Sequence, residues 1–314
     1  MKVLGKAIGF DAIGDARRAE AAGYDGVRVI DHFFSGIPPE APVAVPHALT
    51  TLAAAAAVTD RVLLTQTMLA ATMRHPAEVA QAVAGLDRIS GGRAELGLGT
   101  GWLPLEHESM GLALGTPSDR VERVVEAAAI CRQMFEQQGQ VDFKGRHYRA
   151  HSQARWPETP HIPEILIGAH GPRLLRAAAT VADRIDLLEA MRAGRPCFDG
   201  PDLNDEANLR HRMELAREAA AAHGRELRFS ATLNLIVRDA VADRDEARRP
   251  IAAAAGCALS TLDRELLRLV VTPEELFERV EVLASLGIDR FHIRPADVES
   301  QHWLDEHLTA LQAR

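Results

Sequence analysis

The sequence predicts a single α/β domain over residues 1–314, a (β/α)8 TIM barrel with insertions. Strand-like and helix-like segments alternate along the whole chain, and eight strands can be counted, each followed by helical material. Eight such units fit a chain of 314 residues. A doubly wound open sheet is the alternative, but it needs no eighth unit, and its G-x-G-x-x-G fingerprint does not follow the first strand.

The first half of the chain contains four strand–helix units with local start and stop signals. Gly23 ends the first helix, Pro76 opens the third helix in its first turn, and Thr116 or Ser118 caps the fourth. We expect strands at 3–9, 26–30, 62–68 and 94–99, and helices at 11–22, 47–58, 76–89 and 116–137.

The second half contains four more units and two interruptions. A short hairpin is expected around Gly145 over 141–149, and residues 239–269 show no clear pattern. Thr272 is a good cap for the helix that follows, and Gly287 is a good stop. We expect strands at 165–168, 184–188, 229–237 and 290–293, and helices at 171–181, 205–223, 273–286 and from the last strand to about 313.

Composition limits the function classes. The formal net charge is −8 and no dense cluster of Lys and Arg occurs, which argues against a nucleic-acid partner. No apolar run approaches the ~18 residues of a membrane span, and the first residues do not resemble a secretory signal. The three cysteines are far apart and odd in number, so neither a disulfide framework nor a metal pair is expected. The sequence favours a cytoplasmic protein with a small-molecule substrate.

A barrel of this kind carries its active site at the carboxyl ends of its strands. The residues expected there also include Arg74-His75, Glu106, Glu189 and Arg294. The main candidates are Asp31-His32-Phe33, then Thr65, Thr67 and Met68, then Gly99-Thr100-Gly101-Trp102, and then Gly168-Ala169-His170-Gly171.

Each candidate has a functional and a structural interpretation. Asp31-His32 is a possible proton relay, because imidazole titrates near neutral pH, or Asp31 caps the loop and His32 is a hydrogen-bonded core residue. Neighbouring strand residues point to opposite faces, so only one of the pair points directly into the barrel mouth unless the backbone turns. The segment 99–101 lets a flat ligand approach the backbone, or is an ordinary turn. The segment 168–171 opens a helix whose N–H groups attract an anion, or is a tight turn.

Two further candidates concern Trp102 and a metal ion. Trp102 walls the pocket or packs against an insertion. None of the thirteen histidines stands in an H-x-H or H-E-x-x-H pattern, so no metal is predicted and a metal hydrolase is disfavoured.

Taken in order, these segments resemble the bacterial luciferase-like monooxygenase superfamily. The matching text is EAAGYDGVRVIDHF at 20–33, RHPAEVAQAVAGLDRISGGRAELGLGTGWLPLEHESMG at 74–111, PEILIGAHGPRLLRAAATVADRIDL at 163–187 and TPEELFERVEVLASLGIDRFHI at 272–293. The family fold is a (β/α)8 barrel. Asp31-His32-Phe33 resembles the branch that uses the deazaflavin coenzyme F420.

The resemblance implies roles for individual residues. It makes His32 the acid/base or the group that orients the substrate, and it makes Asp31 a residue that contacts or orients the cofactor. It places a non-proline cis peptide at Thr67-Met68, give or take one residue, beneath the cofactor ring on the strand that also carries Thr65. Gly99, Thr100 and Gly101 would line the ring. Gly168, Ala169, His170 and Gly171 would hold its phosphate or side chain, Phe33 and Trp102 would border the substrate, and the protein would be a homodimer.

The sequence also departs from its relatives. Trp102 stands where sugar-phosphate dehydrogenases of this branch have a glutamate, which argues against a glucose-6-phosphate type of substrate. Glu189 would repel a cofactor phosphate near it. The candidates to offset the charge of the cofactor's phosphate and glutamate tail are Arg74, Arg173, Arg192 and Arg294.

Two alternatives remain within the resemblance. One is an FMN-dependent monooxygenase that uses reduced flavin and oxygen, with a lid in the loop after Arg192. The other is a barrel without a redox cofactor, a binding or fluorescent accessory protein. Fluorescent relatives lack parts of the barrel, and the eight units counted here argue against that alternative.

Overall fold

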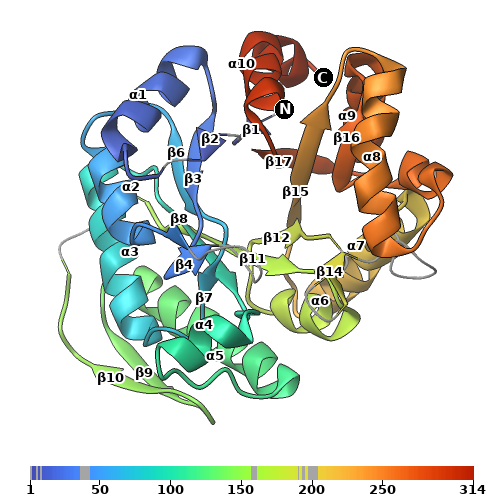
Figure 1. Cartoon of the computed structure of the whole chain (residues 1–314). Helices are drawn as coiled ribbons and strands as arrows, with labels where there is room; N and C mark the ends of the chain where they lie inside the picture. Colours follow the sequence, from blue (N-terminus) through green and yellow to red (C-terminus); the bar gives the residue numbers. More distant parts are fainter. Residues whose placement is uncertain are drawn as a thin grey trace.

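Parallel strands form the centre of the molecule and helices cover them on the outside (Figure 1). This computed structural model describes residues 2–4, 6–7, 9–35, 43–156, 161–189, 191–192, 195–196 and 204–314. Residues 36–42 lie outside the described residues, as do residues 193–194 and 197–203 of the loop after Arg192 that is the candidate lid.

The strands close into a ring. β17 pairs with β1 and β2 pairs with β3, so the two pieces of the first strand join the last strand to the second. A bridge between Leu64 and Ala94 joins β6 to β8, and the remaining neighbours pair in parallel. The open-sheet alternative is therefore wrong and the barrel is confirmed. The order around the ring is β1 and β2 (Lys2–Val3, Lys6–Ala7), β3 (Gly26–Val29), β6 (Leu63–Gln66), β8 (Glu95–Gly99), β11 (Glu164–Ala169), β12 (Arg184–Leu187), β15 (Arg228–Val237) and β17 (Ile288–Pro295).

The outer helices begin and end at the residues that local chemistry favours. Thr116 and Thr272 each form a capping box with the residue three positions later, and Gly23 ends α1 in the left-handed conformation. These expectations are confirmed. The helices are α1 (Ala12–Ala22), α2 (Ala48–Ala56), α3 (Pro76–Ser90), α4 (Pro104–Ser109), α5 (Pro117–Glu136), α6 (Pro172–Ala178), α7 (Glu206–Ala221), α8 (Val241–Ala255), α9 (Pro273–Ser285) and α10 (Val298–Gln312).

Short elements extend the barrel at its rim. The expected hairpin is present as β9 (Val141–Lys144) and β10 (Arg149–Ser152). The region without a clear pattern forms α8, a 3-10 helix (Leu259–Arg264) and β16 (Arg268–Val271), which pairs with the upper part of β15. The other short strands are β4 (Phe34–Ser35), β5 (Val43–Ala44), β7 (Leu69–Ala70), β13 (Met191–Arg192) and β14 (Arg195–Pro196). Within the described residues, no helix is both long and apolar enough to cross a membrane.

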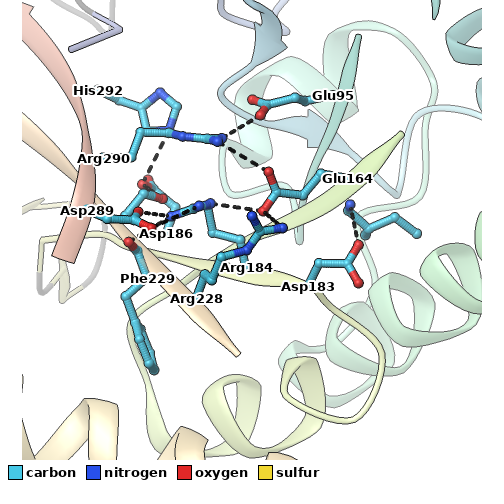
Figure 2. Close-up of polar contacts among 12 residues, drawn as sticks. Glu95, Glu164, Asp183, Arg184, Asp186, Arg228, Phe229, Asp289, Arg290 and His292 are labelled. Carbon is cyan, nitrogen blue, oxygen red and sulfur yellow. Dashed lines mark hydrogen bonds and ion pairs between the residues drawn. The ribbon is translucent and has the colours of Figure 1, made fainter. Parts of the chain in front are cut away.

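The amino-terminal end of the barrel is closed by ion pairs (Figure 2). Arg290 on β17 donates to Glu95 across the barrel at 2.5 Å and to Glu164 at 3.3 Å. Arg184 donates to Glu164 at 3.0 Å and also pairs with Asp289. Apart from Asp289, these charges are largely removed from water, so each depends on its partners. Breaking such a buried pair typically costs about 3–5 kcal/mol.

A second polar layer lies above this floor. The Asp186 carboxylate is fully buried and accepts hydrogen bonds from Ser230 Oγ at 2.7 Å and Thr232 Oγ1 at 2.5 Å. The Nε2 atom of His292 lies 3.7 Å from it. Burial raises the pKa of Asp186 to about 6, while burial and neighbouring arginines lower the pKa of His292 well below its ordinary value.

The raised pKa of Asp186 predicts a pH dependence of stability. The folded protein holds this proton more tightly than an unfolded aspartate with a pKa of 3.8, so this group's contribution to stability falls as the pH rises from about 4 to about 6. Asp186→Asn removes the effect. The variant should gain stability over the wild type across this window, by on the order of 3 kcal/mol at 1.36 kcal/mol per pKa unit. Urea unfolding at several pH values measures the difference.

Asp142→Asn is the matched control, because that side chain is 81% exposed. Its stability curve should run parallel to that of the wild type. If the Asp186→Asn curve also runs parallel, Asp186 does not titrate as described.

Candidate functional site

A cavity of about 500 Å³ opens at the carboxyl ends of the strands, where the sequence places the site. Its wall contains residues from both halves of the chain. Eleven of the fourteen expected site residues line it: Asp31, His32, Thr67, Met68, Gly99, Thr100, Gly101, Trp102, Gly168, His170 and Gly171.

A buried carboxylate holds His32 in place. Glu106 on α4 is 1% exposed, and its Oε2 atom lies 2.9 Å from His32 Nδ1. Its Oε1 atom accepts the backbone N–H of Phe33 at 2.5 Å. The edge of the Trp102 ring system meets the His32 ring, with centroids 6.0 Å apart at 81°. His32 is thus fixed on two sides, and its side chain remains 23% exposed.

This contact determines which ring nitrogen of His32 is free. An ionised carboxylate only accepts hydrogen bonds, so Nδ1 must carry the proton that it donates to Glu106. The neutral imidazole then keeps its lone pair on Nε2, for which the described residues offer no hydrogen-bond partner. A neutral histidine arranged in this way presents Nε2 as its proton acceptor.

Asp31 is engaged by the protein itself. Arg74 donates to both carboxylate oxygens, at 2.6 and 2.8 Å, and Ala70 N donates to one of them at 3.0 Å. Asp31 therefore has a structural role, but it anchors the segment after β6 and not the loop that follows Asp31 itself. Arg74 is not free to offset a cofactor's charge.

Met68 fills the space that two glycines leave at another part of the cavity wall. A Cβ atom added at Gly99 would lie 2.9 Å from Met68 Cβ, and one at Gly168 would lie 2.9 Å from Met68 Cγ. Below them, a Cβ atom at Gly97 would lie 1.9 Å from the backbone oxygen of Gln66, so that glycine admits the neighbouring strand. Gly99 and Gly168 therefore admit Met68, and these three residues form one wall. The expected cis peptide is present at Thr67-Met68.

Other expected residues lie at the edge of the same wall. Gly101 has a φ of +69°, and a Cβ there would lie 2.6 Å from Thr72 Oγ1, so this turn requires glycine. Gly171 caps α6, and no atom lies within 4 Å of its missing Cβ. Thr67 Oγ1 is buried without a hydrogen-bond partner among the described residues.

Three expected residues lie away from the cavity wall. Ala169 follows Gly168 on β11 and is fully buried in the hydrophobic core, because successive strand residues point to opposite faces. Thr65 lies two residues before Thr67 and is also fully buried. Phe33 is held by its backbone N–H and its side chain is not part of the wall. The structure therefore does not bring these three residues to the cavity wall with the other eleven.

The sequence interpretation missed the polar residues of β15 and β16. Thr232 and Asn234 line the cavity, and Arg268 joins them from β16. Ser230, Thr232 and Asn234 alternate with apolar residues, a period-2 signal that could have identified an inward polar face.

The negative charge of Glu189 is compensated, because Arg268 binds both of its oxygens at 2.7 and 2.8 Å. The other missed residues are Ile30, Ala70, Met73, Leu174 and Leu188.

Residues 11–306 match the luciferase-like monooxygenase family. The chain belongs to this family. The family expected from the sequence is therefore confirmed, and the cavity lies where its members' fold places a site.

Several curated relatives of this luciferase-like protein are F420-dependent glucose-6-phosphate dehydrogenases. The one from Kineococcus radiotolerans is 35% identical over 173 residues, 54% of this chain and 49% of the relative. The one from Beutenbergia cavernae is 36% identical over 169 residues, 52% of this chain and 48% of the relative. A pyrimidine monooxygenase RutA from Caulobacter is 37% identical over 102 residues, 32% of this chain and 28% of the relative. The chain spans about half the length of the dehydrogenases that it matches.

Solved structures share the whole fold. An F420-dependent secondary alcohol dehydrogenase in complex with an F420-acetone adduct has a TM-score of 0.78 and 21% identity, with 99% of each chain covered. The F420-dependent tetrahydromethanopterin reductase from Methanopyrus kandleri has a TM-score of 0.70 and 15% identity, with 97% of each chain covered. At these identities the likeness establishes the barrel and its closure.

The packing of Met68 on glycine predicts the effect of Gly168→Ala. The added methyl group meets Met68 Cγ at 2.9 Å and Leu188 Cδ1 at 3.1 Å, so one of them must move. We expect a loss of about 1–3 kcal/mol in the free energy of unfolding, as for other overpacked cores. Chemical denaturation measures it.

Gly85→Ala on α3 is the control, because nothing lies within 4 Å of its added Cβ. It should stabilise the protein by about 0.5–1 kcal/mol, since alanine is the better helix former. Equal effects of the two substitutions would show that Gly168 is not needed for Met68.

Proposed function

We propose that this protein is an F420-dependent oxidoreductase in which His32 moves the proton that accompanies hydride transfer. The observation that carries the proposal is the His32 ring at the cavity wall, with Nδ1 held by the buried Glu106 and Nε2 facing no protein partner. The names of the curated relatives and the Asp31-His32-Phe33 segment support F420 as the cofactor.

The cavity fits a deazaflavin. Its volume of about 500 Å³ lies within the range of about 300–1,000 Å³ that small-molecule and cofactor sites occupy. Thr67 Oγ1 lacks a partner at this wall, as expected where a ligand supplies one. We infer that Thr67, Met68 and the segment Gly99–Gly101 hold the ring, with Gly168, His170 and Gly171 beside it. When bound, F420 supplies a ring carbon that accepts or donates a hydride.

His32 and Glu106 provide the proton chemistry. If an alcohol is the substrate, His32 Nε2 would accept its O–H proton, and F420, when bound, would supply the hydride acceptor. The imidazolium that forms stays paired with the Glu106 carboxylate, which stabilises its charge. In the opposite direction the same nitrogen returns the proton to the carbonyl oxygen. The Trp102 ring contacts the His32 ring on one side, and it restricts where a substrate can lie next to His32.

FMN with oxygen is the second candidate, because one relative is named a pyrimidine monooxygenase. Titration of the purified protein with F420 and with FMN, followed by fluorescence and by the thermal unfolding midpoint, separates the two. We expect saturable binding of F420 and weaker binding of FMN. Tight binding of FMN alone would falsify the proposal for F420.

His32→Ala tests the role of the histidine. It should leave F420 affinity within about threefold and lower the turnover of secondary alcohols about 10²–10⁴-fold, the usual contribution of a general acid or base. His151→Ala, 69% exposed on β10, is the control and should behave as the wild type. Wild-type turnover by His32→Ala would show that the histidine is structural.

We also propose, from the family resemblance, that the protein is a cytoplasmic homodimer. Light scattering should give about twice the 34.1 kDa of one chain. A mass of one chain at micromolar concentration would contradict the dimer.

A further inference from the structure

The cavity has a second wall that differs in character from the Met68 wall. Thr232 and Asn234 on β15, Arg268 on β16 and Arg294 on β17 form it. In the ring, β15 and β17 lie away from β6, β8 and β11, which carry the residues that we assign to the cofactor. His32 follows β3, which lies between the two groups of strands. The cavity therefore has one wall of glycine and methionine and one polar wall.

Arg268 is compensated by a carboxylate on the same wall. Its Nε and Nη2 atoms bind the two oxygens of Glu189 at 2.8 and 2.7 Å, a bidentate pair. The charge of Glu189 therefore offsets the charge of Arg268, and a second anion near Arg268 would also meet this carboxylate.

Arg294 differs from Arg268. It is open to the cavity, and among the described residues it makes no hydrogen bond or ion pair. Because the cavity is recessed in the barrel mouth, the surrounding protein still desolvates its guanidinium and lowers its pKa. The acid that acts on it, Glu189, is already paired with Arg268.

A second arginine lies behind this wall. Arg28 on β3 is buried and does not line the cavity, and among the described residues it donates a hydrogen bond to the carbonyl of Ile293 at 3.4 Å. Burial first and Arg294 second lower the pKa of Arg28 to about 9. The Asp186 carboxylate accepts its hydrogen bonds from Ser230 and Thr232. Arg294 is therefore the arginine that offers an uncompensated guanidinium to the cavity.

We propose that Arg294 binds an anionic group of the substrate, a carboxylate or a phosphate, so that the substrate is a small hydroxy or oxo compound that carries such a group. The inference rests on the proposed function, which places the reacting hydroxyl or carbonyl group of the same substrate at His32. Only the first strand separates β17 from β3, and two strand spacings amount to ~10 Å. One small molecule can therefore reach both Arg294 and His32.

The anionic tail of F420 has the same chemistry, so the experiment must separate it from the substrate. We compare wild type, Arg294→Gln, Arg294→Lys and the control Arg17→Gln, an exposed position on α1. The first measurement is the dissociation constant of F420. The second is the shift of the thermal unfolding midpoint, with and without F420, on adding lactate or 2-propanol, and glycerol 3-phosphate or glycerol, at constant ionic strength.

We expect F420 affinity within about twofold in all four proteins. For at least one anionic probe, the concentration that gives a set rise in the unfolding midpoint of the wild type should be at least tenfold lower than for its uncharged counterpart. Arg294→Gln should raise that concentration at least tenfold, Arg294→Lys should lie between, and Arg17→Gln should match the wild type.

Three results would overturn the proposal. They are equal effects of anionic and neutral probes on the wild type, equal effects of the anions on wild type and Arg294→Gln, and a loss of F420 affinity in Arg294→Gln without a change for the probes. The last result assigns Arg294 to the cofactor's tail. If F420 fails to bind while the anion effect still depends on Arg294, the anion site stands and the proposed function fails.

Discussion

The Glu106 carboxylate connects the loop after β3 to α4, and the geometry of the site depends on it. It accepts the N–H of Phe33 and contacts His32 Nδ1 from 74 residues away in the sequence, and it is almost fully buried. A buried carboxylate that lost either donor would be strongly destabilised, so each contact supports the other. The same contact sets the tautomer of His32 and hence which nitrogen can meet a substrate. The Glu106 carboxylate therefore determines both the position of the His32 ring and which of its nitrogens carries the proton.

The interior of the barrel supports this arrangement from below. Charged pairs close the amino-terminal end (Figure 2). Asp186 and its hydroxyl partners form the next layer, and the cavity lies above them. The layers occupy alternate residues of each strand, so the inward face changes along a strand from charged to small or polar. Glycine on β8 and β11 leaves room for Met68, whereas polar residues on β15 and β17 leave a wall that can bind charge. The alternation of inward-facing and outward-facing strand residues thus produces both the layer of ion pairs and a cavity with two different walls.

Local signals in the sequence were sufficient for the barrel and for part of the site. The eight strands, the Thr116 and Thr272 caps and the position of His32 follow from patterns within a few residues. Contacts between distant segments do not follow from such local patterns. Glu106 can be expected near the barrel mouth, but its bond to His32 depends on where a six-residue helix packs. Asp31 next to His32 suggests a relay, yet Arg74 binds it. The polar alternation of β15 was readable, whereas β16 lies in a region without a periodic pattern.

The central claim concerns the protonation of one ring, and nitrogen NMR of the imidazoles tests it most directly. The signals of His32 are identified as those absent from the spectrum of His32→Gln. For the neutral ring, the account predicts a proton on Nδ1 and a free Nε2 in the wild type. It predicts that Glu106→Gln shifts the ring toward the other tautomer or a mixture. A wild-type ring protonated on Nε2, or a tautomer unchanged by Glu106→Gln, would contradict it.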